Sequence, residues 1–151
     1  MFLVHDTHEE RLELIRKLAK IDMAVAVIIA AMYFEWTYRR AILALGCSTT
    51  KVIREEILDG ATFNDYPRIW NKEVYPRLNI HIEDVLKNFT FKNNPALTLR
   101  NKLVHAESGT VKSDYGNEKV EEIISAIEGL NKFALKYYEP LSRKIVRRKP
   151  R

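Results

Sequence analysis

The sequence predicts an all-α domain, a bundle of four to five helices with short accessory helices. Apolar residues recur at helical spacing along most of the 151 residues, and the alternation that marks a β-strand is nearly absent. Only 5 glycines and 5 prolines are present, which favours a few long elements over many short ones. The length and a hydrophobic content of 46% indicate a single domain over residues 1–151, with a basic tail at 142–151.

The first predicted helical segment begins at a capping box formed by Thr7 and Glu10. Helical character continues to Gly46, the expected C-cap. Such a length exceeds that of a typical globular helix, so we expect a break or kink near Asp22. The apolar run at 23–33 has eleven residues, whereas a bilayer core takes about 20, so it predicts a buried central helix and no membrane segment.

The middle of the chain predicts three short helices. The first spans about 49–58 and ends at Asp59-Gly60. The second is limited to the stretch between Pro67 and Pro76, because proline disrupts a helix interior. The third covers 80–88, with Asn79 as its N-cap.

Two longer helices complete the predicted bundle. One starts with Asn94 as N-cap and Pro95 at the first helical position, and it stops at 108–109. Its inward stripe is expected to consist of Ala96, Leu99, Leu103 and Val104. The other spans about 118–138 and ends before Pro140. Its apolar face comprises Val120, Ile123, Ile124, Ile127, Leu130, Phe133 and Ala134.

The composition argues against several kinds of site. Cys47 is the only cysteine, which excludes an internal disulfide and a multi-cysteine zinc site. His5 and His8 form an H-x-x-H pair without the cysteines or carboxylates that would complete a metal site. No Walker loop, dinucleotide fingerprint or G-x-S-x-G motif occurs. We therefore expect no metal and no cofactor. The single thiol and the lack of an apolar export segment at the N-terminus predict a cytoplasmic protein.

The charge is concentrated near the C-terminus. The net charge is +5 and the sequence pI about 9.3, and the last nine residues hold six Lys or Arg and no acid. Two interpretations of this tail stay open: a solvated, frayed end, or an electrostatic arm for nucleic acid.

The stretch RNKLVH, residues 100–105, is the motif with the clearest chemical meaning. Arg100 and His105 lie near the end of a predicted helix, and Asn101 directly follows the arginine. Two cations in a last turn can simply complement the helix dipole and bond to free carbonyls. The same pair of side chains can also act on a phosphate, and the spacing alone does not decide between these roles.

The motif and its surroundings resemble the HEPN superfamily, whose all-α domains carry R-x4-6-H, often with Asn directly after the Arg. RNKLVH matches the short-spacing form, including Asn101. The order of elements is also similar: a long early helix, an irregular middle, the motif helix and a final long helix. One position departs from the pattern, because HEPN toxins paired with a nucleotidyltransferase antitoxin often carry Tyr two residues after the His, and Glu107 stands there.

The resemblance implies a helical bundle of HEPN type that acts as a metal-independent endoribonuclease, as a toxin or anti-phage defence effector. Such an enzyme uses the 2′-OH of RNA as nucleophile and leaves a 2′,3′-cyclic phosphate and a 5′-hydroxyl. Histidine titrates near neutral pH, so His105 is the expected base. The planar guanidinium of Arg100 is expected to stabilise charge on the phosphate. Asn101 is expected to orient the histidine or a phosphate oxygen.

Helical geometry suggests that one chain does not form the active site alone. On an ideal helix, residues four apart lie about 40° apart and residues five apart about 140°, so Arg100 points away from His105. HEPN domains typically dimerise with two motifs facing a shared cleft, which implies a homodimer with a composite active site. We expect Glu35, Arg39 and Arg40 near its rim as RNA-binding residues, together with Lys102 on the motif helix. Glu35 and Arg39 are also spaced to form an ordinary ion pair on one helix face.

Other functions stay open at this point. The chain could be a HEPN-like domain that binds RNA or a partner protein without cutting, or a helical interaction protein whose RNKLVH only ends a helix. The resemblance implies RNA as substrate and an antitoxin or regulatory protein as a partner, with no role for a membrane.

Overall fold

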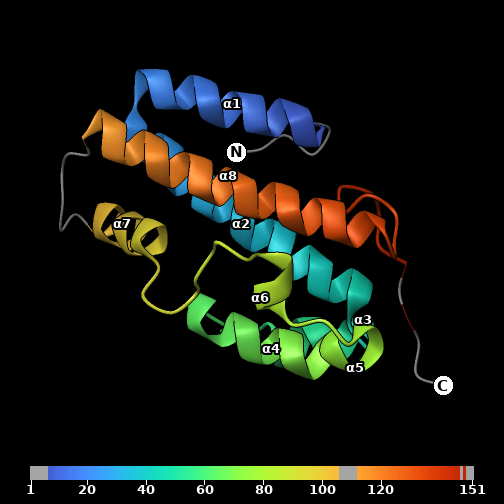
Figure 1. The fold of residues 1–151 in the computed structure, drawn as a ribbon. Coiled ribbons are helices and arrows are strands. Elements are labelled where there is room, and N and C mark those ends of the chain that lie inside the picture. The colour runs from blue at the N-terminus through green and yellow to red at the C-terminus, as the bar shows by residue number, and fades with distance from the viewer. Residues whose placement is uncertain (1–6, 106–111, 147, 149–151) are drawn as a thin grey trace.

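The computed structural model describes residues 7–105, 112–146 and 148, and within these ranges it contains helices and no strand (Figure 1). The elements are α1 (His8–Ile21), α2 (Met23–Leu45), α3 (Thr50–Val52), the π-helical turn η1 (Ile53–Ile57), the 3₁₀ turn η2 (Phe63–Asp65), α4 (Tyr66–Glu73), α5 (Tyr75–Leu78), α6 (Ile82–Val85), α7 (Pro95–Val104) and α8 (Ser113–Leu135). The all-α prediction is confirmed.

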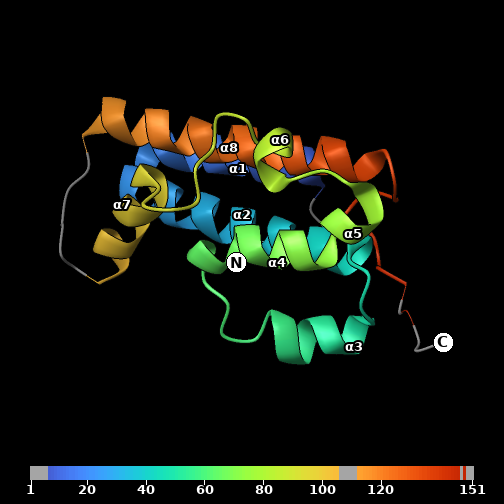
Figure 2. The same cartoon turned by 60° about the horizontal axis from the view of Figure 1, so that its bottom comes forward.

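Helix α2 is the centre of the bundle. It packs against α8, α1 and α7, and α8 runs alongside it over most of its length (Figures 1 and 2). Buried residues occupy more than one side of α2, from Ala26 to Leu45, as its almost uninterrupted apolar composition predicts. Among the helices that the structure describes, none has both the length and the apolar character required to cross a bilayer.

Helices α1 and α2 are separate, and the predicted break at Asp22 is confirmed. Asp22 is extended (φ −148°, ψ 104°); its side chain accepts a hydrogen bond from the Val25 N–H at 3.1 Å and caps α2. Its own N–H donates to the Leu18 carbonyl at 2.7 Å and closes α1. The capping box of Thr7 and Glu10 at the start of α1 is also confirmed. Because the chain turns at Asp22, α1 folds back along α2 and α8 (Figure 1).

The middle of the chain differs from the prediction in two places. Asn79 does not cap the following helix; it adopts a left-handed conformation (φ 53°, ψ 38°) at the end of α5, and α6 starts only at Ile82. Asparagine is one of the few residues that tolerate this conformation, which suits it to end a helix as well as to begin one. The helix α4 ends at Glu73, before Pro76, as predicted, but a separate short helix, α5, was not predicted: Pro76 lies in its first turn, where a missing N–H is tolerated.

Helix α7 begins as predicted but ends earlier. The Asn94 side chain accepts hydrogen bonds from the N–H groups of the second and third helical residues, at 2.9 and 3.2 Å, and Pro95 is the first helical residue. The helix ends at Val104 with His105 as C-cap, and the predicted stop at 108–109 lies outside the described residues. Val104 is 51% exposed, so its predicted place in the inward stripe is wrong: it stands beyond the packed face at the last helical position. Leu97 is buried instead.

Helix α8 confirms its predicted apolar face. All seven residues named for that face are buried. The helix starts at Ser113, more than a turn before the predicted start, and ends at Leu135. This buried face pairs α8 with α2 and makes the two longest helices the frame of the domain.

The described part of the C-terminal tail packs on the domain, so in this part it is neither frayed nor a free arm. The guanidinium of Arg148 donates to three carbonyl oxygens at the end of α2 and in the turn after it: Leu43 at 2.8 Å, Ala44 at 2.9 Å and Ser48 at 3.3 Å. Leu141 and Ile145 are buried. Burial, with Arg77 nearby, lowers the pKa of Arg148. Residues 147 and 149–151 lie outside the described part.

Gly46, the predicted C-cap of α2, leaves no room for a side chain. A Cβ atom there would lie 2.6 Å from the Ile42 carbonyl oxygen and 3.0 Å from Ile53 Cδ1. We expect Gly46→Ala to lower the free energy of unfolding by about 3 kcal/mol, because the helix carbonyl cannot move aside. Urea denaturation measures the loss. In the matched variant Gly60→Ala the Cβ meets nothing within 4 Å, and only its positive φ of 65° costs stability, about 1 kcal/mol. A loss for Gly46→Ala no larger than this would contradict the close packing.

Candidate functional site

The RNKLVH motif lies on α7, and α7 packs on the central helix α2 and on α8 (Figure 2). The cap at Asn94 fixes where the helix begins, and the buried Ala96 and Leu97 anchor its first turn. Residues one turn later on the same face, among them Arg100, are therefore presented to α2.

Arg100 is half-buried, and its guanidinium contacts three neighbours. Nη1 donates to Asn101 Oδ1 at 2.8 Å, and Nη2 lies 4.0 Å from Glu35 Oε2. The guanidinium carbon is 6.0 Å from the centre of the Phe63 ring. The Nε atom is buried and has no hydrogen-bond partner within the described ranges. Asn101 therefore orients Arg100, whereas the sequence predicted that it orients the histidine or a phosphate oxygen.

Glu35 lies between two arginines. Its Oε1 is 3.3 Å from Arg39 Nη2, in the predicted pair one turn apart on α2, and its Oε2 faces Arg100. Arg39 also donates to the carbonyls of Leu58 at 2.9 Å and Ala61 at 3.2 Å. We call Glu35, Arg39 and Arg100 the Arg–Glu–Arg cluster. Two guanidinium groups and one carboxylate give it a net charge of +1.

Tyr66, the first residue of α4, lies beside this cluster and was not predicted. It is fully buried, and its ring stacks on Tyr38 with centroids 4.0 Å apart. Burial raises the pKa of its hydroxyl, the nearby Glu35 raises it further, and Arg39 opposes the shift. The hydroxyl is close to Glu35 and Arg39, although with neither of them, nor with any other described residue, does it form a hydrogen bond of normal geometry. No motif marks Tyr66 in the sequence, and only the fold brings it next to Glu35.

His105 and Lys102 lie outside the Arg–Glu–Arg cluster. Both are exposed, and His105 is the C-cap of α7, with its backbone N–H 3.0 Å from the Asn101 carbonyl. Arg100 is half-buried against α2, whereas His105 stands at the exposed end of the helix. Within one chain, the described structure therefore does not direct the two side chains to a common point.

The predicted place of Arg40 beside the motif needs correction. Its guanidinium donates to the carbonyls of Leu141 and Arg143 and lies 4.8 Å from the centre of the Trp36 ring. Burial lowers its pKa. Consecutive helical residues point about 100° apart, so when Arg39 faces the cluster, Arg40 faces the C-terminal segment.

The described residues contain no group of three or more His, Cys, Asp or Glu side chains able to hold a metal ion. His8 instead pairs with Tyr33: its Nδ1 and the Tyr33 hydroxyl oxygen are 2.8 Å apart. Burial lowers the pKa of His8. The other member of the predicted pair, His5, lies outside the described residues.

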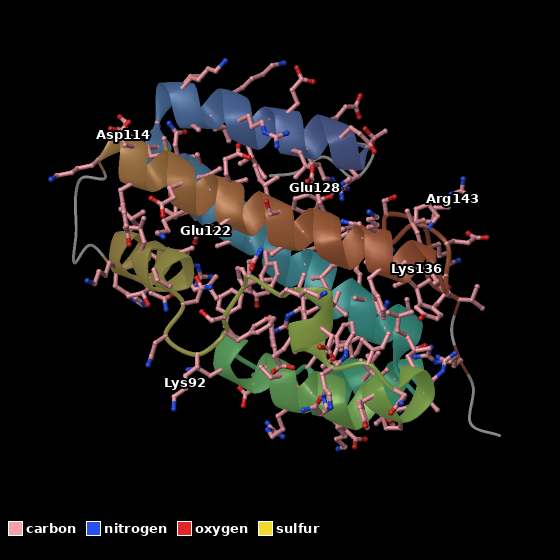
Figure 3. The ribbon with its side chains drawn as sticks, viewed as in Figure 1. Lys92, Asp114, Glu122, Glu128, Lys136 and Arg143 are labelled. Atoms are coloured by element: carbon pink, nitrogen blue, oxygen red, sulfur yellow. The ribbon has the colours of Figure 1, made fainter. Side chains whose placement is uncertain are left out.

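A cavity of about 590 Å³ lies between α8 and the segment 84–89. Apolar residues such as Leu86 and Phe89 line it together with carboxylates of α8, one of which, Glu122, is labelled in Figure 3. Neither the Arg–Glu–Arg cluster nor Tyr66 contributes to its walls. Lys119, a buried cation of α8, lies 2.9 Å from Glu122 and 3.2 Å from Glu118 and so balances part of the acidic charge.

The site therefore consists of the Arg–Glu–Arg cluster with Asn101 and Tyr66, and of His105 at the exposed end of α7. Comparison with protein-family models, with curated protein sequences and with solved structures found no match for this chain.

Proposed function

We propose that the protein is a metal-independent endoribonuclease of HEPN type, a toxin or anti-phage defence effector. The observation that best supports this function is the burial and hydrogen bonding of the Arg100 guanidinium. A half-buried guanidinium whose Nε has no hydrogen-bond partner among the described residues, in a cluster of net charge +1, is suited to bind a phosphodiester.

The proposed reaction requires an anion site and a base. Arg100 binds a non-bridging oxygen of the phosphate and stabilises the charge that develops there. His105 takes the proton of the 2′-OH as the bond from O2′ to phosphorus forms. The bond from phosphorus to O5′ breaks, and the departing oxygen takes up a proton. The products are a 2′,3′-cyclic phosphate and a 5′-hydroxyl.

A second copy of the chain supplies the missing half of the site in this proposal. Val25 and Met32 of α2 are 40% and 50% exposed, and Ile28 between them is half-buried. Their spacing of three and four residues is that of a helix–helix seam, and Glu35 and Arg39 continue it. A homodimer packed through this stripe puts the two clusters next to its twofold axis, where Arg100 of one copy can act with His105 of the other.

An RNA cleavage assay tests the proposal. Purified protein is expected to cut single-stranded RNA in the presence of EDTA. RNA that is bound but stays intact would overturn the enzyme and favour an RNA-binding module, and RNA that is neither bound nor cut would overturn both.

A toxin of this kind needs a partner that keeps it inactive in its host, so an antitoxin or regulatory protein belongs to the proposal.

A further inference from the structure

Two buried polar atoms next to Glu35 make no hydrogen bond of normal geometry to a described residue. They are Nε of Arg100 and the hydroxyl oxygen of Tyr66, which Glu35 and Arg39 approach closely enough to shift its pKa. Burying a donor without a partner is unfavourable, so each such atom in a folded protein calls for an explanation. A small turn of the nearby Glu35 carboxylate can complete a hydrogen bond from the Tyr66 hydroxyl, and Arg100 can meet an incoming anion through the part of its side chain that stays exposed.

The contacts of Glu35 with Arg39 and with Arg100 are not equally strong. Arg39 approaches to 3.3 Å and is itself fixed by two backbone carbonyls, so it is a permanent partner. Arg100 Nη2 remains at 4.0 Å from Glu35 Oε2, and within the described ranges the hydrogen bond of Arg100 is to the neighbouring Asn101. The contact between Glu35 and Arg100 is therefore the one that a competing anion can replace.

We propose that the Glu35 carboxylate occupies the position beside Arg100 that the substrate phosphate takes on binding. When the phosphate displaces Glu35 from Arg100, the Tyr66 hydroxyl donates a hydrogen bond to the displaced carboxylate. This inference rests on the proposed function, because it concerns the same arginine. Tyr66 is then a positioning residue: it does not touch RNA, and it lowers the cost of moving Glu35 away from Arg100.

The chemistry of Tyr66 suits this role. Burial and the nearby carboxylate raise its pKa, so the hydroxyl keeps its proton at neutral pH and can donate. The ring is held by the stack on Tyr38, whose own hydroxyl donates to the Tyr66 carbonyl at 2.5 Å. The hydroxyl of Tyr66 is thus fixed in position, and the side chain that moves is Glu35.

The test is a binding measurement with a probe that cannot be cut. A fluorescent single-stranded RNA with 2′-O-methyl groups lacks the nucleophile, and its affinity is measured by anisotropy for the wild type, Tyr66→Phe, Glu35→Gln and the double variant. Tyr66→Phe is expected to weaken binding about threefold to tenfold, because Glu35 loses its alternative donor. Glu35→Gln is expected to strengthen binding about threefold, because the competing charge is gone. The double variant is expected to bind like Glu35→Gln.

The pattern of the four affinities decides the outcome. Unchanged binding by Tyr66→Phe, or two effects that multiply in the double variant, would overturn the inference, because the hydroxyl would then not act through Glu35. Thermal denaturation checks the fold: Tyr66→Phe is expected to keep the wild-type stability, since the hydroxyl it removes makes no hydrogen bond of normal geometry to a described residue. Tyr75→Phe removes a hydroxyl from α5, outside the cluster, and is expected to change neither binding nor stability.

This experiment separates the inference from the proposed function. If the double variant binds like Glu35→Gln but ordinary RNA is not cleaved, the inference stands and the proposed nuclease is overturned. If RNA is cleaved but the effects of the two substitutions are independent, the nuclease stands and the inference is overturned. A wild type that does not bind the probe overturns the inference, because no phosphate then takes Arg100.

Discussion

Arg100→Ala and His105→Ala are each expected to reduce RNA cleavage at least about 100-fold. Removing a positioned donor to a developing charge and removing a general base both cost about two orders of magnitude or more in enzymes. Arg100 is the arginine of the cluster whose Nε has no partner among the described residues, and His105 is the exposed histidine at the end of the same helix. The rate is measured on single-stranded RNA in EDTA, with each variant purified in the same way.

Matched variants show whether the loss is specific. Arg68 is an exposed arginine whose ion pair is with Asp65 at 3.1 Å, and His81 is an exposed histidine bonded to Asn71 at 2.9 Å. Arg68→Ala and His81→Ala are expected to keep the wild-type rate. Equal cleavage by the wild type and by the Arg100 and His105 variants would reveal a contaminating nuclease and remove the support for this site.

Mixing the two inactive variants is expected to restore activity. In a composite site, Arg100 comes from one copy and His105 from the other. A heterodimer of Arg100→Ala with His105→Ala therefore has one intact site and one that lacks both groups. If equal amounts are unfolded and refolded together, half of the dimers are mixed, so about a quarter of the wild-type rate should return.

No recovery in a sample that contains heterodimers would show that each site uses one chain. Differently tagged copies, purified through both tags, establish that the heterodimers are present. A wild type that is monomeric by light scattering at micromolar concentration would contradict the composite site directly.

Features set by a few neighbouring residues could be predicted from the sequence. The capping box of Thr7 and Glu10, the break at Asp22 and the start of α7 at Asn94 depend on side chains that bond to backbone groups two or three residues away. The buried face of α8 followed from its periodicity. The ion pair of Glu35 with Arg39 was also local, since the two are one turn apart on a helix.

Features that depend on distant parts of the chain could not be predicted. Tyr66 reaches the site only because η2 and α4 pack under α2, and nothing near it in the sequence indicates a functional role. The charges of Arg40 and Arg148 suggested contact with a polyanion, yet both guanidinium groups bond to backbone carbonyls about a hundred residues away. Asparagine is common at both ends of helices, so the sequence alone did not show that Asn79 ends α5 rather than begins the next helix.

In the proposed reaction, the 2′-OH of the RNA attacks the neighbouring phosphorus at the RNKLVH motif, and no metal takes part. The chemical ends of the fragments test this most directly. In EDTA, the wild type is expected to leave 2′,3′-cyclic phosphate and 5′-hydroxyl ends, and His105→Ala is expected to leave the RNA uncut. Fragments with 3′-hydroxyl and 5′-phosphate ends would contradict this reaction, because they arise when water, and not the 2′-OH, attacks the phosphorus.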